Sequence, residues 1–415
     1  MKSRTPFFSP ILTTLFFLIF AHLFASAEIK VALQEVRTWD FDGITFTNDF
    51  PGARINDLEK TGPNEFKILI KPENSPINNS AWYAFQVSAR RSQTITVILD
   101  YEGGRHRYQP KISDDLLTWE PLDRSKWEHD RDANRAILTL DIGRKPIRIA
   151  GQEMIGKEEV WGWMNEVSQK SFVRKATIGK SILGEPIEAM SIGSPDATNY
   201  VFILGRQHPP EISATIALID FVDNLAKNSA LTRRFRENFQ IIVIPMINPD
   251  GVDHGHWRHN MAGVDLNRDW VTFAQPETRA VRDLLLQLAE REGARPFLLL
   301  DFHSTFNDIF YTQKDEHPTF PENFTAKWLS AIQEEFPDYD LRRRGSHTSN
   351  HVTSKAWGYE TFGIPSITYE IGDNTDRDLI REMTAFTSEE VMRILLAELE
   401  NLSEVELAEE DVGAR

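Results

Sequence analysis

Two histidines and two glutamates stand directly after apolar runs in the C-terminal half of the chain. His208 and Glu211 follow "YVFILG". His303 follows "FLLLDF", and Glu370 follows "SITY". Apolar runs of this kind predict buried strands, and the carboxyl ends of parallel strands meet at one edge of a sheet, where ligands bind. A single histidine after a strand is usually structural, but four such side chains predict a pocket at this edge.

These residue types fit a catalytic zinc site, which uses three protein ligands and keeps one position open. His208, Glu211 and His303 would supply two imidazoles and one carboxylate. The chain has no cysteine, so His, Asp or Glu must hold any metal. Zinc lowers the pKa of a bound water to about 7, and Glu370 is the free carboxylate that could accept its proton. We expect one Zn²⁺ per chain. An ordinary helix start is the alternative for "HPPE", because Pro and Glu are both favoured in a first turn.

A further polar cluster lies in "GHWRHNMAGVDLNRDW". Arg258, Asn267 and Arg268 are donors suited to a bidentate grip on a carboxylate or to an oxyanion beside a metal. Surface salt bridging is the alternative for this cluster, and we favour it for "RRR" at 342–344.

The elements that must position these residues fall into two classes. Strand-like runs alternate with helical patterns over 212–227, 276–291, 324–336 and 387–401, which predicts an α/β domain with a mixed, largely parallel central sheet. The preceding part is rich in short strand patterns and turn residues, which predicts an antiparallel β-sandwich. Its core would hold Trp82, Tyr83, Phe85 and Trp119, with carbohydrate stacking as the alternative role. We expect the chain to divide into four parts: a signal peptide at 1–27, the β-sandwich at 28–165, the catalytic domain at 166–402 and an acidic tail at 403–415.

The N-terminus and the charge balance suggest location and exclude some partners. Lys2 and Arg4 precede an apolar run, and Ala25-Ser26-Ala27 follows it, which predicts a secretory signal cleaved after Ala27. The expected protein is therefore periplasmic or secreted, without a membrane segment after cleavage; an uncleaved membrane anchor is the alternative. The net charge of −16 and the lack of a long basic block argue against nucleic acid as a partner.

The motifs "HPPE", "NPDG", "DLNR", "DFHS" and "TYEIG", in this order and together with Arg258, resemble those of the zinc carboxypeptidases over residues 170–400. The form "PMINPDGVDHGHWRHNMAGVDLNRDW" looks like the cytosolic-carboxypeptidase branch, which includes tubulin deglutamylases and carries a β-sandwich before the catalytic domain. "AWYAFQVS" adds a weaker resemblance in the sandwich itself.

The resemblance implies a role for each matching position. It implies that His208, Glu211 and His303 bind the metal and that Glu370 is the general base. It further implies that Arg258 polarises the scissile carbonyl, that Asn267 and Arg268 hold the substrate's terminal carboxylate, and that Asp265 orients His208 from behind.

One departure and one specificity candidate stand out in "RGSHTSNHVTSKAWGYE". Thr348 or Ser349 stands where digestive members of the family have a mobile tyrosine; His347 or His351 is an alternative for its role, and Tyr359 matches another family tyrosine. Lys355 falls where the family places the base of the side-chain pocket, and a cation there would favour an acidic C-terminal residue. A solvated lysine is the alternative.

The sequence thus predicts a zinc-dependent metallocarboxypeptidase that hydrolyses the C-terminal peptide or isopeptide bond of peptides or proteins. Three alternatives stay open. The first is a carboxypeptidase or amidase for cell-wall peptides with γ-glutamyl-diamino acid bonds, and the second is an N-acyl-amino-acid deacylase. The third is a non-catalytic binding protein, although every ligand and the base are present.

Overall fold

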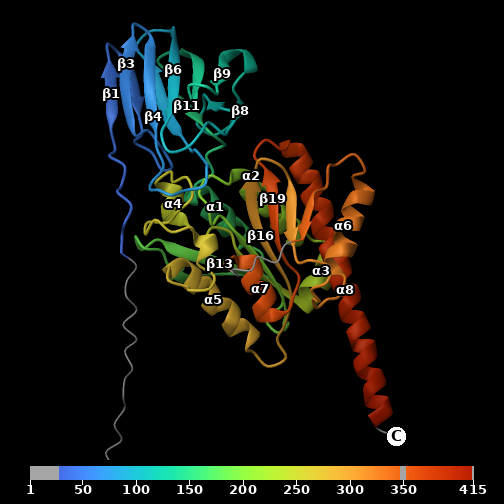
Figure 1. Ribbon diagram of the computed structural model, residues 1–415. Coiled ribbons are helices and arrows are strands. Elements are labelled where there is room, and N and C mark those ends of the chain that lie inside the picture. The colour runs from blue at the N-terminus through green and yellow to red at the C-terminus, as the bar shows by residue number, and fades with distance from the viewer. Residues whose placement is uncertain (1–27, 346–351, 414–415) are drawn as a thin grey trace, which may run out of the picture.

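The computed structural model describes residues 28–345 and 352–413, with side chains described as far as residue 402. A β-sandwich stands at one end of an α/β body, and the long C-terminal helix α8 (Arg377–Gly413) packs along the body and extends away from the sandwich (Figure 1). The predicted fold class, a β-sandwich followed by an α/β domain with a largely parallel central sheet, is confirmed.

The sandwich consists of two sheets that pack apolar faces against each other. In the described part of the chain one sheet has the order β1-β2-β5-β11-β7-β8 and is antiparallel throughout. The other has the order β3-β4-β6-β10-β9, and here β4 and β6 run parallel, a departure from the antiparallel expectation. The strands are β1 (Thr38–Phe41), β2 (Ile44–Thr47), β3 (Asp57–Gly62), β4 (Glu65–Ile70), β5 (Ala84–Ala89), β6 (Gln93–Tyr101), β7 (Lys111–Ser113), β8 (Glu120–Pro121), β9 (Trp127–Asp130), β10 (Arg135–Ile142) and β11 (Ile147–Ala150).

Period-two patterning explains these strands. In β4 every second residue is buried, and Phe66, Ile68 and Ile70 point inward. Trp82, Tyr83 and Phe85 are buried in the same core, while Trp119 packs against it half-buried.

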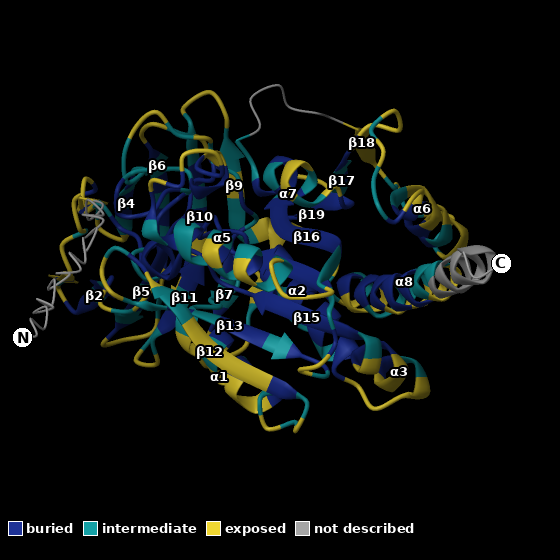
Figure 2. Ribbon diagram, turned by 90° about the horizontal axis from the view of Figure 1, so that it is seen from below, coloured by how far each residue is buried: buried dark blue, intermediate teal, exposed yellow. Residues whose placement is uncertain are grey.

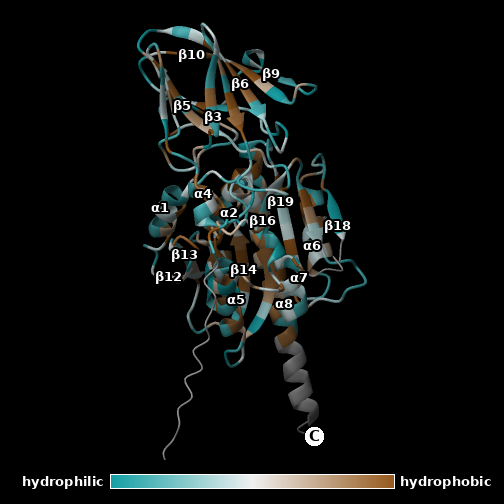
Figure 3. Ribbon diagram, turned by 60° about the vertical axis from the view of Figure 1, so that its left-hand side comes forward, coloured by the Kyte–Doolittle hydropathy of each residue, from teal (hydrophilic) through white to brown (hydrophobic). Residues whose placement is uncertain are grey.

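The body is built on a mixed sheet whose order in the described residues is β12-β13-β15-β14-β16-β19-β17-β18. The central strands β15, β14, β16 and β19 run parallel, and antiparallel pairs lie toward both edges. The strands are β12 (Val173–Lys180), β13 (Pro186–Ile192), β14 (Asn199–Gly205), β15 (Phe239–Ile244), β16 (Arg295–Thr305), β17 (Ile309–Thr312), β18 (Arg343–Gly345) and β19 (Ser366–Gly372). Because helices cover both faces of the parallel strands, β14 and β15 are apolar along nearly their whole length, as the brown colour of β14 in Figure 3 shows. The strands β16 and β19 carry polar residues among the apolar ones.

Helices cover both faces of this sheet. The helices α1, α2, α3, α6 and α8 pack on one face and α5 and α7 on the other. Figure 2 shows the strands β15, β16 and β19 in the dark blue of buried residues, whereas the edge strand β12 and the outer sides of α3 and α6 are exposed. The bounds are α1 (Lys157–Val167), α2 (Ile212–Leu225), α3 (Ala230–Asn238), α4 (Pro249–Asp253), α5 (Pro276–Ala289), α6 (Phe324–Glu335) and α7 (Ser354–Phe362), with short 3-10 turns η1 (Arg124–Lys126) and η2 (Leu266–Arg268).

The helix α1 belongs with the body, because Val160 and Met164 are buried in the body's core. We therefore propose to place the domain boundary before Lys157 rather than at residue 165. Residues 1–27 lie outside the described residues, and so do the side chains of the predicted tail at 403–415. Among the helices that the structure describes, none has the length and apolar character needed to span a membrane.

Candidate metal centre and substrate pocket

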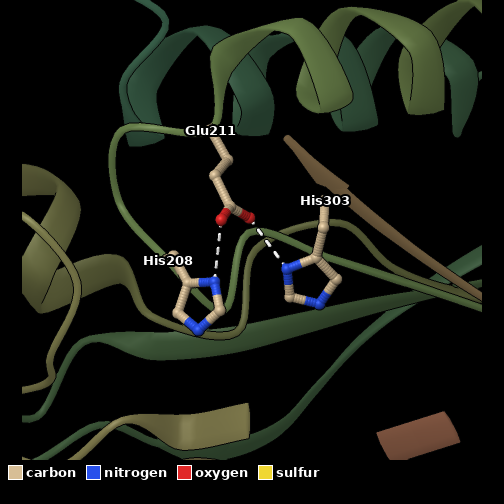
Figure 4. A group of neighbouring side chains, drawn as sticks. All are labelled: His208, Glu211 and His303. Carbon is tan, nitrogen blue, oxygen red and sulfur yellow. Dashed lines mark hydrogen bonds and ion pairs between the residues drawn. The ribbon is translucent and has the colours of Figure 1, made fainter. Parts of the chain in front are cut away.

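The three candidate metal ligands come from the carboxyl ends of two neighbouring parallel strands. His208 lies in the turn after β14, Glu211 immediately precedes α2, and His303 lies near the end of β16. The carboxylate of Glu211 lies between the two imidazole rings (Figure 4), with Oε1 2.8 Å from Nδ1 of His208 and Oε2 2.8 Å from Nδ1 of His303. One ligand atom from each residue lies within 4.8 Å of the others. A single cation can therefore contact all three.

A strained turn presents the first two ligands. Arg206 has a φ of +53°, which is uncommon for a residue with a side chain, and it turns the chain out of β14. Its buried guanidinium donates to the carbonyl of Pro209 at 2.7 Å and to Oγ1 of Thr215 at 2.9 Å. These bonds tie the turn to the first turns of α2, so that His208 and Glu211 are held on the same side of the turn.

A buried aspartate stands behind each histidine. Nε2 of His208 lies 2.9 Å from Oδ1 of Asp265, as the resemblance implied, and Nε2 of His303 lies 2.8 Å from Oδ2 of Asp301. In both rings the nitrogen facing the aspartate is the one remote from Glu211. A carboxylate at that place favours a proton on Nε2 and leaves Nδ1 as the lone pair for a metal.

The electrostatics of the trio favour a cation. Burial lowers the pKa of His303, but Asp301 and Glu211 outweigh it and hold that pKa well above its ordinary value. Burial likewise raises the pKa of Glu211, yet the two histidines bring the net value far below the ordinary range. The carboxylates of Asp301 and Glu211 on either side of the buried His303 ring favour positive charge here, and two nitrogens with a carboxylate are a ligand set that zinc accepts. The residues present therefore fit a zinc ion.

Glu370 is the free carboxylate of the site. Its strand β19 pairs with β16 so that Glu370 lies opposite His303 in the register. Its Oε2 atom is buried without a hydrogen-bond partner among the described residues, and burial raises the pKa of this carboxyl to about 7. A carboxylate with a pKa near neutrality can both accept and return a proton, which general acid–base catalysis requires.

The predicted donors lie around the same centre. Nε of Arg258 donates to Oδ2 of Asp265 at 2.6 Å, so that one carboxylate orients both this arginine and His208. The amide of Asn267 has its oxygen 3.0 Å from the backbone nitrogen of Ser354 and its nitrogen 3.3 Å from Nε2 of His303. Arg268 uses one guanidinium nitrogen to donate to the carbonyl of Asn267 at 2.7 Å. The structure thus brings these three donors and the metal trio together.

A cavity of about 720 Å³ joins these residues. From the body it is lined by the metal trio, Glu370, the three donors, and Tyr311, Arg344, Thr368 and Lys355. Lys355 is buried rather than solvated, and its Nζ donates to the carbonyl of Thr312 at 3.2 Å. Burial lowers the pKa of Lys355 to about 8, so it stays mainly charged at neutral pH. Arg342 forms a surface ion pair with Asp340, and Arg343 forms one with Asp315. Surface salt bridging was the interpretation favoured for these two arginines.

The sandwich also contributes to the wall of this cavity, through Asn78, Asn79, Ser80 and Arg107. The sequence reasoning missed these residues and Asp301. A signal existed for Asp301, because it is a charged residue inside an apolar strand and lies two positions before His303, on the same side of β16. No signal in the sequence joined Arg107 to a site far along the chain.

Part of the loop before α7 is not described. Thr348, Ser349, His347 and His351, which were considered in place of the family's mobile tyrosine, lie outside the described residues. Tyr359 lies in α7 next to His317, with ring centroids 6.1 Å apart.

Several proteins are similar to this chain over most of its length, at low sequence identity. A cytosolic carboxypeptidase 6 of Caenorhabditis elegans is 21% identical over 352 residues, which cover 77% of this chain and 76% of the relative. Cytosolic carboxypeptidase 6 of Mus musculus is 21% identical over 71% of this chain, which spans 60% of that relative. The crystal structure of a metallo-carboxypeptidase from Burkholderia cenocepacia superimposes with a TM-score of 0.72 at 19% identity, over 87% of this chain and all of that one.

The relatives contradict the prediction of an exported protein. The relatives are cytosolic carboxypeptidases, which contradicts the predicted periplasmic or secreted location. The prediction depended on a short segment in which basic, apolar and small residues follow one another. Such an order depends only on residue types over a short stretch, and residues 1–27 lie outside the described residues.

The comparison with protein families settles the identity of the catalytic part. The sequence model described as zinc carboxypeptidase matches residues 160–390, which is more than half of the chain. The match includes the trio that fits a zinc ion and the buried glutamate opposite it. The chain therefore belongs to the zinc carboxypeptidase family, whose members are zinc-dependent hydrolases that act on the C-termini of peptides and proteins.

Proposed function

We propose that this carboxypeptidase removes acidic residues from the C-termini of peptides or proteins. The observation that carries the proposal is the buried cation Lys355 in the wall of the cavity that also contains Glu370 and the metal trio. Tyr311 on β17 pairs with Thr368 on β19, and both residues line the same cavity as the lysine. Arg344 adds a further positive charge to this wall. An acidic side chain would find complementary charge here, and a lysine side chain would meet repulsion.

The substrate's terminal carboxylate is assigned to Asn267 and Arg268. Both residues line the cavity next to the metal trio. A guanidinium and an amide can donate several parallel hydrogen bonds to a carboxylate, which fixes its orientation as well as its position. Such a grip would make the enzyme an exopeptidase, because a peptide without a free C-terminus would leave these donors unpaired.

The roles at the scissile bond follow from the same geometry. When bound, zinc would polarise the carbonyl and lower the pKa of a water molecule. Glu370 takes a proton from the attacking water and passes it to the nitrogen of the leaving amine, for which a pKa near 7 is suited. Arg258, held by Asp265, donates to the carbonyl oxygen as negative charge develops on it.

A substrate panel tests the proposal. Acylated dipeptides that differ only in a C-terminal Glu, Asp, Leu or Lys should show the highest kcat/KM for the acidic residues. Lys355→Met keeps a long unbranched side chain and removes the charge, so it should reduce kcat/KM for the Glu substrate by roughly 10- to 100-fold. The Leu substrate should be affected much less. Lys314→Met, at an exposed lysine paired with Glu316, is the matched control.

Equal kcat/KM values for Glu and Leu substrates in the unsubstituted enzyme would contradict the proposed specificity. Hydrolysis of N-acyl amino acids in preference to acylated dipeptides would favour the deacylase alternative. The cell-wall alternative depended on export and loses its basis with it.

A further inference from the structure

A loop of the sandwich reaches across to the segment that carries Arg258. This loop, residues 71–83, connects β4 to β5. The carboxylate of Glu73 accepts three backbone N–H bonds from consecutive residues of the body: from Trp257 at 2.7 Å, from Arg258 at 2.9 Å and from His259 at 2.7 Å. Bonds from N–H groups to an ionised carboxylate are about twice as strong as those between neutral groups. The backbone of Arg258 is therefore fixed from the sandwich.

The rest of the segment 255–263 is attached to the sandwich as well. Asn74 donates to the carbonyl of Gly263 at 3.0 Å and contacts Nδ1 of His259 at 2.6 Å. Trp257 is fully buried in the core of the sandwich, where its Nε1 donates to the carbonyl of Trp82 at 3.1 Å.

Gly255 marks the closest approach of the two backbones. It has a φ of +60°, and a Cβ at this position would lie 2.7 Å from the carbonyl oxygen of Ala53. Only glycine avoids this overlap and tolerates this backbone conformation. The segment therefore has one arrangement against the sandwich.

The charge of Glu73 suits this contact. Burial raises the pKa of Glu73, but His256, the N–H groups of His259 and Trp257, and Arg54 outweigh it, so that the pKa is below its ordinary value. The carboxylate stays ionised at neutral pH and accepts all three bonds. Glu73 is not among the residues that line the cavity, which fits a role exerted through Arg258 rather than on the substrate.

We infer that Glu73 is a positioning residue for Arg258, through which the β-sandwich sets the geometry of the reacting centre. The inference rests on the proposed function, in which Arg258 donates to the carbonyl oxygen. The side chain of Arg258 is oriented by Asp265 in the body, whereas its backbone is held by Glu73. Loss of the second contact would let the guanidinium shift although the metal trio remains in place.

A double-mutant cycle tests this inference in the full-length, zinc-loaded enzyme. The variants are Glu73→Gln, Arg258→Ala and the two combined, assayed with the acylated dipeptide that ends in Glu. Arg258→Ala should lower kcat by roughly 100- to 1000-fold, as expected for an oxyanion donor. Glu73→Gln should lower kcat by roughly 10- to 100-fold with little change in KM, because a small displacement of a catalytic group costs that much. In the Arg258→Ala background Glu73→Gln should have almost no further effect.

Zinc content and thermal stability separate positioning from general damage. Glu73→Gln should bind as much zinc as the unsubstituted enzyme, and Glu59→Gln, which alters a surface pair with Lys67 on the sandwich, should change neither kcat nor zinc content. If Glu73→Gln does not fold, Asn74→Ala loosens the same segment from the same side and takes its place in the cycle.

Two results would overturn the inference while the proposed function stands. One is an unchanged kcat in Glu73→Gln, and the other is a loss that multiplies with that of Arg258→Ala. An unchanged kcat in Arg258→Ala would instead refute the role of Arg258 in the proposed function, and the inference would fail with it.

Discussion

The second aspartate behind the metal trio makes a quantitative prediction. Asp301 is fully buried, and its Oδ2 accepts from Nε2 of His303 at 2.8 Å, from Nε2 of Gln207 at 2.6 Å and from Oγ of Ser354. Its Oδ1 is buried without a partner in the described structure. Asp301→Asn can keep one accepting oxygen at the position of Oδ2, but it removes the negative charge and places an NH₂ group where no acceptor lies.

The lost charge weakens zinc binding, and the unpaired amide lowers folding stability. Removal of a carboxylate that supports a metal-bound histidine lowers metal affinity by about 10- to 100-fold, which corresponds to about 1.4–2.7 kcal/mol of binding free energy. The unpaired amide adds about 1–3 kcal/mol to the loss of folding stability. Competition with a chromophoric chelator at fixed pH measures the zinc Kd, and thermal denaturation of the zinc-free protein measures the second effect.

The matched control is Ser354→Ala, which removes a different donor to the same carboxylate and leaves the bond to His303 and the charge intact. It should change the zinc Kd much less than Asp301→Asn does. If Asp301→Asn binds zinc as tightly as the unsubstituted protein, Asp301 does not support His303, and the argument from the paired aspartates is wrong.

The remaining predictions concern stability. Burial raises the pKa of Glu277 to about 7 from an ordinary value of 4.5. The contribution of this carboxyl to folding stability is therefore fully present below pH 4.5 and is lost as the pH rises through 7. Denaturant titrations should show about 3 kcal/mol less stability at pH 8 than at pH 4.5 from this group, and Glu277→Gln should abolish that difference. Arg107→Gln leaves its buried partner Asp373 unpaired and should destabilise the protein by about 3–5 kcal/mol in urea denaturation, with Arg107→Gln/Asp373→Asn destabilised less.

Each of these has an outcome that contradicts it. Identical pH profiles for Glu277→Gln and the unsubstituted protein would mean that Glu277 is not a buried proton acceptor. If the double variant at Arg107 and Asp373 is as unstable as the single one, Arg107 stabilises the protein through bonds other than its ion pair with Asp373. Burial raises the pKa of Asp373 although Arg107 lowers it, as expected when the ion pair offsets only part of the desolvation of the carboxylate.

Local patterns were sufficient for most of the body. The predicted run Tyr200–Gly205 lies in β14, which begins one residue earlier, because an apolar run flanked by turn residues has few alternatives to a buried strand. The helices α2, α5 and α6 lie where their apolar spacing predicted them. His208, Glu211, His303 and Glu370 meet because parallel strands deliver their carboxyl ends to one edge.

Contacts between distant segments could not be predicted in the same way. Glu73 and Arg107 acquire their partners only when the sandwich and the body pack, and nothing in their local sequence distinguishes them from other charged residues. The parallel pairing of β4 with β6 also depends on tertiary packing, since the same alternating pattern suits either direction. The prediction of export was wrong for a similar reason, because it depended on one short N-terminal pattern interpreted without the rest of the chain.

The claim that zinc and Glu370 together carry out the hydrolysis is tested most directly by Glu370→Gln. This variant should bind as much zinc as the unsubstituted protein, because Glu370 does not belong to the trio, and its kcat should fall by roughly 100- to 10,000-fold because no group accepts the proton from water. Zinc content by elemental analysis and kcat on the same sample give the answer. Unchanged turnover with full zinc occupancy would contradict the account.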